Sequence, residues 1–117
     1  MNISLLHKNA LVGGASAGIG RATALELAAL GANVTLLART ESALKETLAT
    51  LDTSQGQKHQ YLTVDFSDSQ GLLSSVTKLL ESQIVHILVN NTGGPAGGPI
   101  TDARGEAFLT TYHNHLI

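Results

Sequence analysis

Three glycines within seven residues are the feature of this sequence whose spacing points most directly to chemistry. Gly14, Gly18 and Gly20 lie between a short apolar run, Asn9–Val12, and an Ala- and Leu-rich segment. Glycine allows a sharp turn and a close approach of a ligand to the backbone. A helix that begins here would present unpaired N–H groups and a positive dipole to an anion such as a diphosphate. The ligand-free alternative is a glycine-rich turn with a purely structural role. The residues of this turn expected to bind a ligand are Gly14, Ser16, Ala17, Gly18, Ile19 and Gly20.

The elements that must position this turn follow from the hydrophobic pattern. Apolar runs of strand length alternate with segments whose Leu and Ala residues recur at helical spacing. The expected strands are residues 9–12, 33–38, 60–64 and 85–89, and the expected helices are 18–30, 41–51, about 68–80 and 102–117. This β-α-β-α-β-α-β-α order predicts an α/β fold with right-handed crossovers and a parallel sheet between helix layers.

Single residues mark some boundaries of these elements. Gly31 is expected to end the first helix. Ser67, with Gln70 three residues later, has the pattern of a capping box at the start of the third helix. Thr101 or Asp102 would cap the last helix. His86 lies in an apolar run, so we expect a neutral, hydrogen-bonded core residue.

Composition excludes several classes of protein. The chain has 117 residues, 43% of them hydrophobic, which fits one domain with a real core. A net charge of −2 does not favour nucleic-acid binding, and the lack of cysteine removes disulfides, thiol nucleophiles and Cys-ligated zinc. No apolar run approaches the roughly 20 residues of a membrane helix, and no secretory signal is apparent. We expect a cytoplasmic protein with no membrane or nucleic-acid partner.

Four sequence segments together resemble the short-chain dehydrogenase/reductase family. They are the Gly-x-x-x-Gly-x-Gly turn, its strand entry Leu11-Val12-Gly13-Gly14, the segment Val64-Asp65-Phe66-Ser67-Asp68 and Asn90-Asn91-Thr92-Gly93. Two residues depart from the family pattern, since Gly13 stands where Thr is usual and Thr92 replaces Ala. The resemblance covers essentially the whole chain but only the first half of a family member. It implies an incomplete Rossmann-type sheet with strand order 3-2-1-4.

The preferred nucleotide is indicated by the end of the second expected strand. About 20 residues beyond the glycines, an NAD site needs a carboxylate for the ribose 2′-hydroxyl, whereas an NADP site uses Arg. Ala38 stands at the family's acid position, and Arg39 follows it as a partner for a 2′-phosphate. Glu41 is the competing acid, but it fits better in the first turn of the next helix. We therefore expect NADP(H) rather than NAD(H), with Ser16 near the same phosphate.

The resemblance implies further contacts to the dinucleotide. Asp65 would accept a hydrogen bond from the adenine amino group, with Phe66 beside the ring. Asn91, Thr92 and Gly93 would lie along the cofactor. The alternative for Asp65 and Asn91 is a structural role, because both residue types are common in turns and at helix starts.

The family's catalytic Tyr-x-x-x-Lys is missing from this sequence. Neither Tyr61 nor Tyr112 is followed by Lys four residues later. The family's helix Asn would fall at Asn114 or His115, where a plain surface role is the alternative. His113 and His115 are two residues apart and would face apart on a helix, so no metal site is expected.

Two classes of function remain open at this stage. In the first, residues 1–117 are a single dinucleotide-binding domain, truncated before the catalytic helix, of an NADP(H)-dependent oxidoreductase acting on a small carbonyl or alcohol. In the second, the chain is a dinucleotide-binding module or a remnant without activity. The fourth strand would be left as an exposed edge that favours pairing with another chain. Family resemblance likewise implies a homo-oligomer for the full-length protein.

Overall fold

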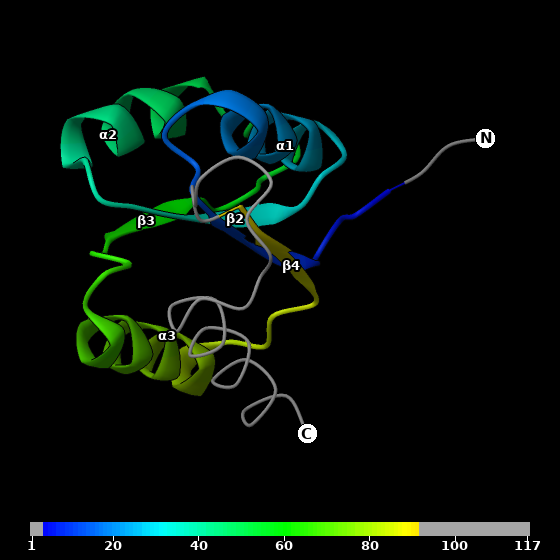
Figure 1. Cartoon of the computed structure of the whole chain (residues 1–117). Helices are drawn as coiled ribbons and strands as arrows, with labels where there is room; N and C mark the ends of the chain where they lie inside the picture. The colour runs from blue at the N-terminus through cyan, green and yellow to red at the C-terminus, as the bar shows by residue number, and fades with distance from the viewer. Residues whose placement is uncertain (1–3, 92–117) are drawn as a thin grey trace.

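The computed structural model describes residues 4–91, which form three helices and four strands (Figure 1). In chain order these are β1 Asn9–Gly13, α1 Gly18–Ala29, β2 Asn33–Ala38, α2 Glu41–Thr50, β3 Gln60–Thr63, α3 Ser69–Ser82 and β4 Ile87–Asn90. The alternation predicted from the sequence is confirmed over this range, with boundaries that move by one or two residues. The expected helix over residues 102–117 lies outside the described residues.

All described strands are parallel and lie in the order β3-β2-β1-β4. The register pairs Gly13 at the end of β1 with Leu37 of β2 and Asn90 of β4. The sheet extends in one direction through β2 and β3 and in the other through β4. The carboxyl ends of the central strands therefore meet at one edge of the sheet, where open α/β sheets bind their ligands.

Two apolar layers cover the faces of the sheet, because successive side chains of a strand point to opposite faces. In β1, Ala10 and Val12 pack into the cluster beneath α1 and α2, together with Ala24 and Leu44. Leu11 points the other way, into the cluster beneath α3. Figure 1 shows α1 and α2 on one side of the sheet and α3 on the other. The predicted sheet between helix layers is confirmed.

The first and third helices have well-defined ends. Gly31 follows α1 with a φ of 106°, a conformation that favours glycine, so the predicted stop is confirmed. The predicted cap of α3 is wrong. Asp68 rather than Ser67 is the N-cap, and its Oδ1 accepts a hydrogen bond from the Gly71 N–H at 3.1 Å. The helix thus begins one residue later than the Ser67–Gln70 pattern indicates.

The prediction of a buried His86 is also wrong. His86 is exposed and lies just before β4, where its Nδ1 accepts a hydrogen bond from the Asn9 N–H at 3.0 Å. His86 is therefore hydrogen-bonded, as predicted, but its side chain is not buried. The residues of β4 are themselves only half-buried.

Within residues 4–91, no helix has the length and apolar character needed to cross a membrane.

Candidate functional site

A cavity of about 280 Å³ lies at the carboxyl ends of the strands. Its walls come from the turn after β1 and from the residues that end β2 or follow β3 and β4. The lining residues are Gly14, Ser16, Ala17, Ala38, Arg39, Phe66 and Asn91. Six of these were predicted to bind a ligand. The seventh, Ala38, was not predicted to bind a ligand. It was named only because it stands where the NAD-binding members of the family carry an acidic residue.

The turn after β1 is held in place by backbone hydrogen bonds to its neighbours. Gly14 has a φ of 71°, which explains the need for glycine where the chain leaves the strand. The N–H groups of Gly14 and Ala15 both donate to Leu37 O, at 2.9 and 3.1 Å. On the other side, the Asn91 N–H donates to Gly13 O at 3.1 Å. The turn therefore has a fixed position relative to the ends of β2 and β4.

Gly20 lets the first helix pack against this turn. A Cβ at this position would overlap with Gly14 O, would lie 2.8 Å from the Gly14 carbonyl carbon and would crowd Asn91 Nδ2 at 3.2 Å. Gly20 is buried, so a side chain there has no route to solvent. Glycine at this position therefore permits the close packing of α1 against the turn.

The N-terminus of α1 carries no side-chain cap. Ala17 is the N-cap residue and makes no side-chain hydrogen bond, and the first turn contains no acidic residue. Gly18 has a φ of 60°, and a Cβ added there would meet nothing within 4 Å in the described chain. Ile19 is 76% exposed. This helix end therefore offers open space and backbone N–H groups, which suit an anion.

The end of β2 contributes a cation and no carboxylate. Arg39 is exposed and lines the cavity, whereas Ala38 is buried and lines it with a methyl group. Glu41 lies in the first turn of α2, as predicted, where its carboxylate is 3.5 Å from Lys45 Nζ. Both side chains of this pair are more than half exposed, so the pair contributes little to stability.

Asp65 and Phe66 both follow β3, but Phe66 is buried and Asp65 is exposed. Phe66 is 8% exposed and packs into the cluster beneath α3 while also lining the cavity. Asp65 is exposed, and its Oδ1 accepts hydrogen bonds from Ser67 Oγ at 2.6 Å and from the Ser67 N–H at 2.9 Å. Thus Phe66 forms part of the cavity wall, and Asp65 stands in the turn directly beside it.

Thr92, Gly93, Asn114 and His115 lie outside the described residues. Asn90 ends β4, and its buried Oδ1 has no hydrogen-bond partner among the described residues. No group of three or more His, Asp or Glu residues that could hold a metal ion occurs in residues 4–91.

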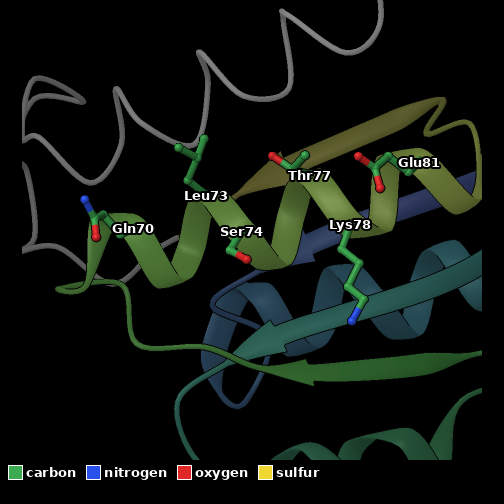
Figure 2. Close-up of a pocket in the computed structure, with 6 residues that line it drawn as sticks. All are labelled: Gln70, Leu73, Ser74, Thr77, Lys78 and Glu81. Atoms are coloured by element: carbon green, nitrogen blue, oxygen red, sulfur yellow. The ribbon is translucent and has the colours of Figure 1, made fainter.

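A larger cavity of about 580 Å³ lies along α3, and its described lining comes from that helix alone. Figure 2 shows the lining side chains spread along several turns, with Leu73 and Thr77 on one side of the helix and Lys78 on another. Because these groups do not converge on a common point, the smaller cavity at the glycine turn is the better candidate for ligand binding.

The fold and this geometry agree with comparisons against known proteins. The sequence profile of the short chain dehydrogenase family matches residues 8–116, so the chain belongs to this family. A short chain dehydrogenase/reductase of Aspergillus oryzae is 38% identical over 116 residues, which cover 97% of this chain and 44% of that protein.

Solved structures show the same arrangement. A metagenomic short-chain oxidoreductase in complex with NADP superposes with a TM-score of 0.79 at 29% identity, covering 96% of this chain and 57% of that one. The L-sorbose reductase of Gluconobacter frateurii, complexed with NADPH and L-sorbose, gives a TM-score of 0.73 at 28% identity, covering 99% of this chain and 47% of that one. The chain thus spans about half the length of the proteins that it matches.

Proposed function

We propose that this chain binds NADP(H) in the cavity at the glycine turn, as the cofactor-binding part of an oxidoreductase. The observation that carries the proposal is that one cavity joins the Gly14 turn to Arg39 at the end of β2. One end of this cavity suits a diphosphate, and the other offers a cation for a further phosphate. NADP(H) carries both groups, whereas NAD(H) carries only the diphosphate.

The diphosphate would lie at the N-terminus of α1. The uncapped N–H groups there can donate to phosphate oxygens, and no acid of the first turn repels them. Gly18 leaves the approach to the backbone open. Ser16 and Ala17 form the adjoining wall of the cavity. The exposed Ile19 flanks this approach with an apolar side chain.

Arg39 would bind the 2′-phosphate of the adenosine ribose. An arginine–phosphate pair is a charge-assisted interaction with a planar donor set that matches the phosphate oxygens. Ala38 presents no carboxylate that would repel the phosphate or bind a free 2′-hydroxyl. The two neighbouring positions therefore both favour NADP(H) over NAD(H).

The adenine and the remainder of the cofactor would be held from β3 and β4. We propose that Asp65 accepts a hydrogen bond from the adenine amino group, with Phe66 beside the ring. Asn91 lines the cavity at the end of β4. Thr92 and Gly93, which follow it in the sequence, are proposed to continue along the cofactor.

When bound, the nicotinamide cofactor would donate a hydride to a carbonyl group or accept one from an alcohol group. The residues of this chain hold and orient the dinucleotide. Residues 1–117 are proposed to act as one dinucleotide-binding domain. The proposed proton-relay position is Asn114 or His115. The Tyr-x-x-x-Lys pair of the family does not occur in this sequence, so hydride transfer is proposed for the whole protein and not for these residues alone.

The proposal is tested by titrating the chain and its Arg39→Ala variant with NADPH and with NADH. Loss of a hydrogen bond to a charged group costs about 1.5–3 kcal/mol, so the Kd for NADPH should rise about tenfold to a hundredfold. The Kd for NADH should stay nearly unchanged. Lys78→Ala is the matched control, because it removes a cation from α3 and not from the cavity. An equal loss for both nucleotides in Arg39→Ala would contradict the role of Arg39.

A further inference from the structure

In the turn between β3 and α3, both hydrogen-bond donors of Ser67 bind one carboxylate oxygen of Asp65. Asp65 Oδ1 accepts from the hydroxyl of Ser67 at 2.6 Å and from the N–H of the same residue at 2.9 Å. The backbone of the turn is closed separately, because the Asp68 N–H donates to Asp65 O at 3.0 Å. The Ser67 hydroxyl is therefore an addition to a turn that is already hydrogen-bonded.

The helix that follows does not use the Ser67 hydroxyl. Asp68 is the N-cap of α3, and its Oδ1 accepts from the Gly71 N–H at 3.1 Å. A serine just before a helix commonly serves as its cap. Here Ser67 makes its side-chain hydrogen bond to Asp65 instead, although both residues are exposed.

Two donors on one oxygen restrict the rotation of an exposed carboxylate. An aspartate on a surface turn otherwise samples several rotamers about its side-chain torsions. The Ser67 N–H and Oγ lie on the same residue, so both donors hold Asp65 Oδ1 on the side of Ser67. Phe66 stands between the two residues in the sequence and lines the cavity. The Asp65 carboxylate is thus held against Ser67 in the turn that also carries Phe66 of the cavity wall.

We propose that Ser67 is a positioning residue that orients the Asp65 carboxylate toward the 6-amino group of adenine. This inference rests on the proposed function, in which Asp65 accepts a hydrogen bond from that amino group. Ser67 acts through Asp65 and has no contact of its own with the nucleotide. Its hydroxyl contributes to discrimination between bases and leaves the diphosphate and 2′-phosphate contacts unaffected.

The experiment compares NADPH with its hypoxanthine analogue, in which a 6-oxo group replaces the 6-amino group. The wild-type chain should prefer NADPH, because an oriented carboxylate accepts from an amino group and repels a carbonyl oxygen. In Ser67→Ala this preference should fall about threefold to tenfold, because Asp65 Oδ1 loses the hydroxyl donor and keeps the Ser67 N–H donor. The Kd for the hypoxanthine analogue should stay unchanged or decrease slightly.

Two further variants separate positioning from a structural role. Ser67→Thr retains a hydroxyl at the same position and should retain the wild-type preference for NADPH. Ser69→Ala removes a neighbouring hydroxyl and should also leave the preference unchanged. The urea unfolding midpoint of each variant shows whether it is folded under the conditions of the titration.

The possible outcomes differ for the two proposals. If Ser67→Ala weakens both nucleotides equally or keeps the wild-type ratio, Ser67 only stabilises the turn and the inference is overturned. If the wild-type chain binds NADPH and its hypoxanthine analogue equally, the adenine contact of Asp65 is refuted while the phosphate contacts of the proposed function stand. If the wild-type chain binds neither nucleotide, the proposed function itself fails and this inference fails with it.

Discussion

Replacing Gly20 by alanine should destabilise the chain, although alanine is normally the better residue in a helix. Gly20 is buried in α1, and its backbone faces the Gly14 turn. The new methyl group would overlap with Gly14 O and would lie 2.8 Å from the Gly14 carbonyl carbon. Both atoms belong to backbone, so no side-chain rotation can relieve the contact.

The size of the effect follows from two opposing contributions. Alanine gains about 1 kcal/mol over glycine in a helix interior. Overpacking of a tight site costs about 1–3 kcal/mol and sometimes more. The upper part of this range applies here, because the Gly14 and Ala15 N–H groups hold the turn against Leu37 O at 2.9 and 3.1 Å. A net loss of about 2 kcal/mol is expected, which corresponds to a fall of about 10 °C in Tm.

Chemical and thermal unfolding followed by circular dichroism measure this loss. Ala22→Gly is the matched control, since Ala22 is exposed on the same helix and the substitution is the reverse one. It should cost about 1 kcal/mol from helix propensity alone. If Gly20→Ala instead raised the unfolding midpoint by the amount that Ala22→Gly lowers it, the argument from close packing would be refuted.

Three further predictions concern separate parts of the chain. Gly18→Val should weaken NADPH and NADH alike in a titration, because it places a branched side chain where the diphosphate approaches; retained binding would show that Gly18 is structural only. Asp68→Ala removes the cap on the Gly71 N–H and should lower the free energy of unfolding by about 1 kcal/mol in urea titrations; an unchanged midpoint would contradict this. Hydrogen bonds from Ser54 lower the pKa of Asp52 from its usual value of 3.8. The ionised carboxylate therefore stabilises the fold above pH 3.8, and this contribution is lost as the pH falls through the lowered pKa. The difference in urea midpoint between wild type and Asp52→Asn should therefore be present at neutral pH and disappear in acid, and a constant difference would exclude the carboxylate charge as its cause.

The strands and their parallel arrangement could be predicted because several local signals agree, whereas the strand order 3-2-1-4 was implied by the family resemblance. The β1 run is apolar on both faces, and it ends at a glycine turn followed by a helical pattern. Repetition of this unit leaves few topologies, since parallel crossovers are right-handed. The glycine spacing also predicted a tight turn after β1, because the φ of 71° at Gly14 favours glycine and a Cβ at Gly20 would overlap with the Gly14 backbone.

The errors occurred where tertiary packing chooses between equivalent local patterns. Ser67 and Asp68 are adjacent residues with good capping side chains, and sequence alone does not say which one starts the helix. Packing of Leu72, Val76 and Leu79 against the sheet determines the position of α3 and therefore selects Asp68. The exposure of His86 depends likewise on what covers the start of β4, which the apolar character of its sequence neighbours does not reveal.

The site is harder to predict than the fold because its residues are distant in the sequence. Arg39 and Phe66 line the same cavity, yet α2 and β3 separate them along the chain. Only the strand order brings the ends of β2 and β3 beside the glycine turn. The same strand order places Ala38 in the lining of the cavity. Because Ala38 has no carboxylate, it supports the proposal that the site prefers NADP(H) to NAD(H).

The cavity at the glycine turn is proposed to hold the dinucleotide. The most direct measurement is a titration of the isotope-labelled chain with NADPH, followed by NMR of the backbone amides. If the dinucleotide binds in this cavity, the outer face of α3 should stay unchanged and the shifts should be concentrated at the lining residues Gly14, Ser16, Ala17, Ala38, Arg39, Phe66 and Asn91. Shifts concentrated on α3 around Leu73 and Lys78, or no shifts at saturating NADPH, would contradict this proposal.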